Sequence, residues 1–429
     1  MAPACKASVT FGLMSAVILL VYLKTLPPTI VGGDSGDIVV SAWKLSVPHP
    51  PGYPTITMIG HVFMHYLLPF GEPAWRMGVL NAIFAASSSL LLGLTAFELW
   101  DDTLSAATAT ILYSFSPLVW QYATTPEVFA LNNLFVALLV AIYVKVLTAA
   151  DKHAALRWTR LGVLCGGIAL GNQHTIVILL VPIALDVGGA EEEEATAKTT
   201  GRFCSLSDSY LLLALLSAAH GDEIWGDVTT AGGLLRHLLR TEYGTFDLIS
   251  GVDRSLSSAL TSLLLYLLTL SRESSHLAIP SLLLSCWFAG SSAAGRDRKR
   301  VIVSRRLLLL WAAYASSTGG ATFLSITPCN CCNSLNLAHR RRSYRGVLKR
   351  FHLQPNYLVF VLIAHLLAKV CRNAMRIAGG RKEEEEKENK KAKLDMQLPL
   401  SVAVVVIVTS LQVSSTLEPD VWVEKSRSE

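Results

Sequence analysis

Charged residues are scarce in this sequence. Of its 429 residues, 16% are charged and 52% are hydrophobic, whereas about a quarter of the residues in a soluble protein carry a charge. A chain with so few charges cannot cover its outer surface with polar groups, so lipid must cover much of it. The net charge of +5 is small, and the basic residues lie in short clusters between apolar runs, as in membrane loops. The composition predicts a polytopic membrane protein and argues against a soluble domain or a nucleic-acid partner.

Metal-ligand spacing and glycosylation sequons are also missing. The sequence has eight cysteines, and its one cluster, Cys329, Cys331 and Cys332, lacks the paired CxxC or histidine partners of a zinc site. We interpret this cluster as part of a loop that has no functional role or is disulfide-bonded, and we expect no metal site. No Asn-x-Ser/Thr sequon occurs, so glycosylation of the chain cannot assign its sides.

Apolar runs recur along the whole chain. The first, Phe11–Leu23, is interpreted as an uncleaved span because no Ala-x-Ala site follows it. The later runs are Met77–Leu99, Leu104–Trp120, Val128–Leu147, Leu161–Leu185, Tyr210–Ala219, Leu277–Phe288, Leu307–Phe323, Tyr357–Val370 and Leu398–Leu411. We interpret Leu161–Leu185 as a hairpin of two short spans and Leu256–Leu270 as a helix at the luminal interface. The sequence thus predicts an all-α bundle of about eleven transmembrane helices.

Positive charge indicates the orientation of the chain, because basic loops stay cytoplasmic. Lys152, Arg157 and Arg160 mark one cytoplasmic loop, and the basic cluster Arg296–Arg306 marks a second. With the amino terminus inside, the loop Gly32–Trp75 lies in the lumen. The charge runs at residues 191–194 and 381–393 are typical of solvated linkers.

The first luminal loop carries the most informative residues. It reads GGDSGD at 32–37 and SVPHPPGYP at 46–54. The glycines permit tight turns and the prolines stiffen the chain, so Asp34 and Asp37 could be held in fixed positions, as a binding site requires. The alternative is a helix start, with Asp34 or Ser35 as N-cap and Asp37 in the first turn before Ile38–Leu45. The spacing alone favours this cap.

Three further segments place polar groups near span ends. Asn172-Gln173-His174 interrupts an apolar run and is either functional or a hydrogen-bonded hairpin tip. Glu127 is either a site residue or an acidic residue at a helix start. In Trp225–Phe246, four leucines fall on one helical face and two arginines on another. This pattern predicts an amphipathic helix on the membrane surface, which either anchors the chain or steers a lipid phosphate.

These strings resemble a known family. GGDSGD followed by VPHPPGYP is similar to the GT-C-type multi-spanning protein O-mannosyltransferases that act on IPT domains of plexin-type receptors, together with their bacterial relatives. The similarity continues in the strings WR at 75–76, TTPEVFALNN at 124–133, GNQHT at 171–175 and RTEYGTF at 240–246. Residues 1–255 are therefore expected to form a GT-C-like membrane core. Residues 256–429 are expected to add diverged transmembrane helices, with only weak sequence similarity to the family near 346–354.

The resemblance implies a multi-pass enzyme of the endoplasmic reticulum membrane. It implies transfer of mannose from dolichyl phosphate mannose to Ser or Thr of secretory-pathway proteins, by an inverting single displacement without a cofactor. It assigns Asp34 as the catalytic base and Asp37 as its neighbour. It further implies donor or phosphate contacts from His49, Tyr53, Asn172, His174, Arg236 and Arg240, and acceptor or supporting roles for Glu127, Glu242 and Tyr243.

Elementary chemistry agrees with this assignment. An acceptor hydroxyl must lose its proton as it attacks the anomeric carbon, and one carboxylate within hydrogen-bond reach can accept that proton. The leaving group is already a phosphate, so it needs cations or hydrogen-bond donors and no general acid. Two alternatives stay open. The same fold could glycosylate a lipid, or the chain could be a transporter, although no inverted repeat is found and the carboxylates lie in a loop.

Overall fold

The computed structural model describes residues 3–187, 225, 228, 230–239, 241, 256–290, 295–323 and 350–380, and the regular elements among them are all helical. The amino-terminal part contains α1 (Pro3–Lys24), α2 (Ser35–Lys44), α3 (Pro54–Val62), the π-helix η1 (Phe63–Leu67), α4 (Pro73–Trp100), α5 (Thr103–Ser114), α6 (Pro117–Ala123), α7 (Phe129–Thr148), α8 (Lys152–Leu170), the 3₁₀ turn η2 (His174–Ile176) and α9 (Val177–Val187). The later part contains α12 (Ala231–Leu238), α13 (Leu256–Glu273), α14 (Ala278–Gly290), α15 (Gly295–Phe323), the 3₁₀ turn η4 (Arg350–His352) and α17 (Leu353–Gly380).

Four helical segments of the described residues are long and apolar enough to cross a bilayer. They are Cys5–Lys24, Pro73–Trp100, Phe129–Thr148 and Arg350–Val370. The prediction of an all-α, multi-pass membrane protein is therefore confirmed. The expected spans at 210–219 and 398–411 and the linkers at 191–194 and 381–393 lie outside the described residues, so the count of about eleven spans stays a prediction.

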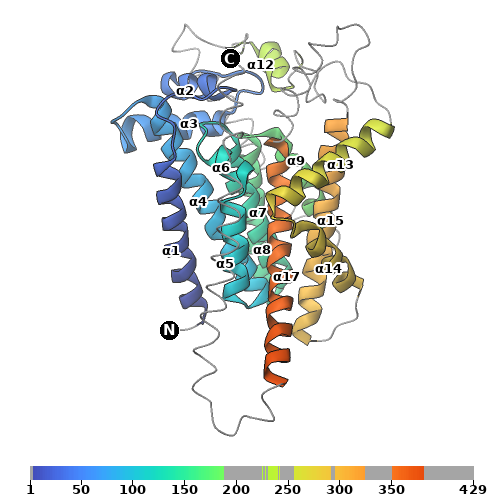
Figure 1. Ribbon diagram of the computed structural model, residues 1–429. Coiled ribbons are helices and arrows are strands. Elements are labelled where there is room, and N and C mark those ends of the chain that lie inside the picture. The colour runs from blue at the N-terminus through green and yellow to red at the C-terminus, as the bar shows by residue number, and fades with distance from the viewer. Residues whose placement is uncertain are drawn as a thin grey trace.

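The helices form an elongated bundle with two distinct ends (Figure 1). α4 packs against α1, α5 and α7, and α17 packs against α5 and α14. The amino terminus and the start of α8 lie at the lower end in Figure 1, while α2, α3 and α12 lie at the upper end. The loop Gly32–Trp75 and the Lys152 loop are thus at opposite ends of the bundle, as the charge pattern predicts.

Two expected features are wrong in detail. The run Leu104–Trp120 is not one helix, because Ser116 caps a new helix by accepting a hydrogen bond from the Val119 amide, and Pro117 is the first residue of that helix. Proline lacks the amide hydrogen that would continue α5. The basic cluster Arg296–Arg306 is not a loop either, since it forms the first turns of α15. Arg306 pairs there with Asp186 of α9, and arginine and lysine are good helix formers.

The polar interruption of the run Leu161–Leu185 lies where the sequence predicts it. α8 ends at Leu170, and α9 begins at Val177 after the turn η2. A β-carbon on Gly166 of α8 would lie 2.9 Å from Leu180 Cδ2 of α9, so the two helices are in close contact. α13 crosses obliquely at the outside of the bundle (Figure 1), and it is not among the four segments suited to spanning.

Candidate functional site

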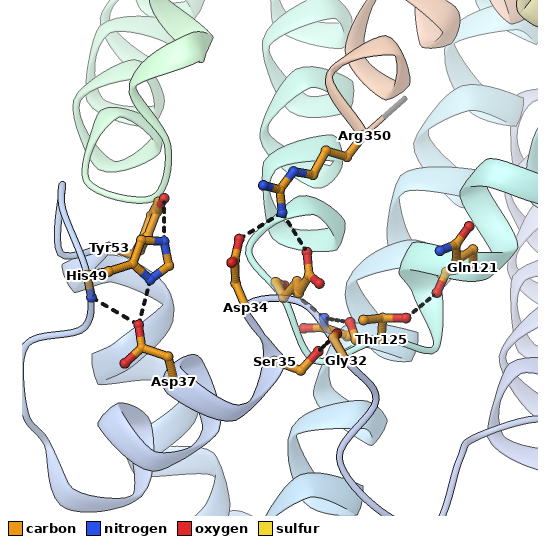
Figure 2. Close-up of polar contacts among 11 residues, drawn as sticks. Gly32, Asp34, Ser35, Asp37, His49, Tyr53, Gln121, Thr125 and Arg350 are labelled. Carbon is orange, nitrogen blue, oxygen red and sulfur yellow. Dashed lines mark hydrogen bonds and ion pairs between the residues drawn. The ribbon is translucent and has the colours of Figure 1, made fainter. Parts of the chain in front are cut away.

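Asp34 stands at the start of α2 but does not cap it. Its carboxylate makes no side-chain capping hydrogen bond to α2. It accepts a hydrogen bond from Arg350 Nη1 at 2.7 Å instead, and Figure 2 shows the two side chains pointing toward each other. Gly33, at φ +82, turns the chain into this position, a backbone conformation that glycine adopts without steric cost. The helix start lies where the alternative predicts it, with Asp34 at the N-cap position and Asp37 in the first turn, but the Asp34 side chain does not cap the helix.

Asp37 is paired with His49 across the first luminal loop. The carboxylate Oδ2 lies 2.5 Å from His49 Nδ1 and accepts a 3.0 Å hydrogen bond from the His49 amide. His49 Nε2 lies 3.3 Å from the Tyr53 hydroxyl, so the three residues form a chain of polar contacts (Figure 2). Burial raises the pKa of Asp37, but the hydrogen bonds and charge of His49 outweigh it and hold that pKa below its ordinary value of 3.8.

A cavity of about 370 Å³ lies at the upper end of the bundle. This volume falls within the range of about 300–1,000 Å³ that is typical of small-molecule sites. Five segments and Trp225 line the cavity: the start of α2, the proline-rich loop, the start of α7, the break between α8 and α9, and the turn η4 before α17. The lining residues are Gly33, Asp34, Asp37, Ile38, His49, Pro51, Tyr53, Glu127, Val128, Phe129, Gln173, His174, Thr175, Trp225, Arg350 and Phe351.

Glu127 belongs to the loop before α7, and this loop is tied to α4. Asn81 of α4 donates hydrogen bonds from Nδ2 to the Thr125 carbonyl at 2.5 Å and to the Glu127 carbonyl at 2.8 Å. Glu127 is 5% exposed, and its Oε2 lies 3.7 Å from Arg350 Nη1. Its carboxylate therefore belongs to the cavity wall and faces a cation.

Arg350 joins the two carboxylates from the far end of the sequence. Its guanidinium carbon lies 5.3 Å from the centre of the Phe129 ring and 5.8 Å from that of Phe351. Its side chain is 17% exposed, and one nitrogen, Nη1, reaches both Asp34 and Glu127. The sequence reasoning did not name this residue. The sequence features that could have identified it are its position shortly before an apolar run and the weak similarity to the family near 346–354.

The break between α8 and α9 contributes a third wall. Gln173, His174 and Thr175 line the cavity, and Gln173 Oε1 accepts a 3.2 Å hydrogen bond from Gln354 of α17. Asn172 does not line the cavity: it is fully buried and donates from Nδ2 to the Val128 carbonyl at 3.1 Å. The structure thus places Asn172 as a brace between the hairpin tip and the start of α7.

The predicted amphipathic segment is represented by α12 and Trp225. Trp225 lines the cavity, and its amide donates to the Val47 carbonyl at 3.2 Å. Arg236 of α12 is exposed and is not part of the lining, whereas its neighbour His237 is buried beside Gly52. Arg240, Glu242 and Tyr243 lie outside the described residues.

The described ranges contain no group of three or more His, Cys, Asp or Glu side chains that could hold a metal ion. The cavity instead combines three carboxylates with one guanidinium and two imidazoles. Such a set can accept a proton from a hydroxyl group and offset the charge of a phosphate.

Sequence comparisons find similarity between this chain and protein O-mannosyl-transferases. Residues 34–189 match the model of the Protein O-mannosyl-transferase TMEM260 N-terminal domain. The chain is 33% identical over 376 residues to Protein O-mannosyl-transferase TMEM260 of Mus musculus. The aligned region covers 84% of this chain and 50% of the mouse protein. The chain is 26% identical over 361 residues to Protein O-mannosyl-transferase tmem260 of Dictyostelium discoideum, covering 80% of this chain and 42% of the relative. These matches confirm the resemblance seen in the sequence.

The length of the relatives differs from that of this chain. The chain spans about half the length of the mouse protein and less than half of the Dictyostelium protein. Among solved structures, the crystal structure of ArnT from Cupriavidus metallidurans bound to undecaprenyl phosphate has 14% sequence identity and a TM-score of 0.39, covering 85% of this chain and 78% of that one. The likeness to the family therefore rests on the sequence comparisons.

Proposed function

From the similarity of this chain to the TMEM260 protein O-mannosyl-transferases, we propose that it is a GT-C-type glycosyltransferase of the endoplasmic reticulum membrane. The proposed reaction moves mannose from dolichyl phosphate mannose to a Ser or Thr hydroxyl of a secretory-pathway protein. IPT domains are the proposed acceptors, by analogy with the family.

One observation carries this proposal: the cavity wall unites Asp34, Glu127 and Arg350 at the upper end of a membrane bundle. A lipid-linked sugar phosphate presents its phosphate near the membrane surface, where a fixed cation can bind it. Arg350 supplies that cation and lies near two aromatic rings, and arginine suits phosphate because its planar fork offers several donors. The carboxylates beside it are the candidate proton acceptors.

The proposed step is a single displacement. The acceptor oxygen attacks the anomeric carbon of mannose as the bond from that carbon to the phosphate oxygen breaks. The electron pair leaves with the phosphate, whose charge Arg350 offsets, and the hydroxyl proton passes to the carboxylate of Asp34. Configuration at the anomeric carbon is inverted because attack and departure occur on opposite faces.

The pair formed by Asp37 and His49 supports the loop in this scheme. The carboxylate fixes the imidazole, and the imidazole contacts the Tyr53 hydroxyl. All three side chains line the cavity. They are proposed to position the sugar of the donor, while Asp34 accepts the proton.

The test is a transfer assay with purified protein, dolichyl phosphate mannose and an IPT-domain acceptor. Asp34→Asn should lower turnover by about 10²-fold or more, which is the usual contribution of a general base, while the protein still inserts and accumulates normally. Asp151→Asn is a matched control, because Asp151 caps α8 outside the cavity lining and asparagine caps equally well. Near-normal turnover of Asp34→Asn would contradict the assignment of the base. Transfer to a lipid but not to protein would contradict the proposed acceptor.

A further inference from the structure

The guanidinium of Arg350 has unequal partners. Nη1 lies 2.7 Å from Asp34 Oδ2 and 3.7 Å from Glu127 Oε2. Nε is buried and has no hydrogen-bond partner. The rings of Phe129 and Phe351 limit movement of the cation itself. Arg350 is therefore a cation beside two aromatic rings, and Asp34 is its nearest carboxylate.

The charges around Arg350 do not balance in the presence of another anion. Two carboxylates already face one guanidinium, so the group carries an excess of negative charge. A phosphate that entered beside them would add to this excess, and like charges at close range in a partly buried site repel strongly. Binding of a phosphate to Arg350 therefore requires that one carboxylate gives up its contact.

Exposure decides which carboxylate can move. The side chain of Asp34 is 37% exposed, whereas that of Glu127 is 6% exposed. Asp34 also follows Gly33, whose backbone is at positive φ, while Glu127 is held by the hydrogen bonds of Asn81 to its loop. Asp34 can turn toward the cavity at little cost, and Glu127 cannot.

We propose that a lipid-linked phosphate competes with Asp34 for Arg350, so that binding of the donor releases the Asp34 carboxylate toward the acceptor. Asp34 is the base only within the function proposed above, so this part of the inference rests on that function. The competition itself concerns binding alone. Its consequence is an ordered reaction, in which the acceptor hydroxyl finds a free carboxylate only after the donor phosphate has engaged Arg350.

The experiment measures binding of dolichyl phosphate to the purified full chain in detergent, without acceptor and without turnover. Asp34→Asn should bind dolichyl phosphate about tenfold more tightly than the unsubstituted protein, the equivalent of about 1.4 kcal/mol, although its turnover in transfer is lowered. Asp37→Asn is the matched control. It removes the same charge from the same cavity, but the Asp37 carboxylate is bonded to His49 and not to Arg350.

The outcomes separate the proposals. Tighter binding by Asp34→Asn but not by Asp37→Asn supports competition, and equal tightening by both would show a long-range charge effect and overturn it. Unchanged or weaker binding by Asp34→Asn also overturns it. If Asp34→Asn fails to fold, Glu127→Gln serves instead, because it removes the second carboxylate from Arg350 and should likewise tighten binding.

Two further arms identify the ligand. Arg350→Gln should lose most of its affinity for dolichyl phosphate, and an unchanged affinity would overturn the role of the guanidinium. Inorganic phosphate should displace dolichyl phosphate only at far higher concentration, and equal competition would assign the site to free phosphate. A chain that shows the predicted binding pattern but no transfer would refute the proposed function and leave the competition intact.

Discussion

Gly33→Ala tests the geometry of the site without changing any charge. Gly33 lies between the two carboxylates of the cavity wall: it precedes Asp34, and a β-carbon built on it would stand 2.7 Å from Glu127 Oε1. Its φ of +82 also lies in the left-handed region. Alanine at this position therefore faces both an unfavourable backbone conformation and a collision with a buried side chain.

The expected magnitudes follow from these two effects. The left-handed conformation costs an L-residue about 1–2 kcal/mol, which we expect as a loss in the free energy of unfolding. Ordinary contact begins at 3.4 Å, so the Glu127 carboxylate or the loop must shift to accommodate the methyl group. A misplacement of about 1 Å among catalytic groups can cost about 10²-fold in rate. We expect kcat to fall by about tenfold or more.

The assay compares Gly33→Ala with Gly36→Ala by thermal unfolding in detergent and by transfer activity. Gly36 lies in the first turn of α2, and the nearest atom to a β-carbon there is Ile30 Cγ2 at 3.8 Å. Alanine is a better helix residue than glycine, so Gly36→Ala should be neutral or stabilising by about 0.5–1 kcal/mol. Equal damage from both substitutions, or normal activity of Gly33→Ala, would refute this reasoning.

Three further predictions follow from the described residues. Because the pKa of Asp37 is lowered in the folded protein from its ordinary value of 3.8, its contribution to stability is present above that value and is lost as the pH falls below it. Thermal unfolding followed from about pH 5 down to about pH 2 should show a loss at the acid end that Asp37→Asn lacks. Transfer should survive chelation, and activity that is lost with a chelator and restored by magnesium or manganese would contradict metal independence. In a cysteine-depleted variant, a cysteine at exposed Glu72 should be labelled from the lumen and one at exposed His153 from the cytosol; labelling of the Glu72 position from the cytosol would overturn the topology.

Local patterns in the sequence were enough to predict the environment of most segments. The apolar runs predicted α1, α4, α7 and α17, and the polar string at 171–175 predicted the break between α8 and α9. The first luminal loop could also be interpreted from its sequence, because glycine permits tight turns and proline restricts the backbone. Asp34, Asp37, His49 and Tyr53 are close in sequence, and all of them line the cavity.

The predictions from the sequence were wrong at two places, where individual residues change the local secondary structure. Ser116 and Pro117 divide an apolar run that hydropathy treats as continuous. The arginines at the start of α15 have the charge of a loop but the propensity of a helix, and the pair formed by Arg306 and Asp186 fixes them to α9. Hydropathy indicates whether a segment meets lipid or water. It carries no information on the hydrogen bonds of the segment or on its contacts with residues distant in the sequence.

The sequence by itself determined that this chain is a helical membrane protein, that the loop Gly32–Trp75 and the Lys152 loop lie at opposite ends of the bundle, and that Asp34 is a candidate site residue. Hydropathy and charge decide the first two properties, because each depends on the solvent that a segment meets. The candidacy of Asp34 came instead from the glycines and prolines of its loop and from the resemblance of that loop to a known family. Only the tertiary structure decided the partner of Asp34, which is Arg350, 316 positions later in the chain. That contact depends on how α2, α7 and α17 pack at one end of the bundle, and packing between distant helices leaves no periodic pattern in the sequence.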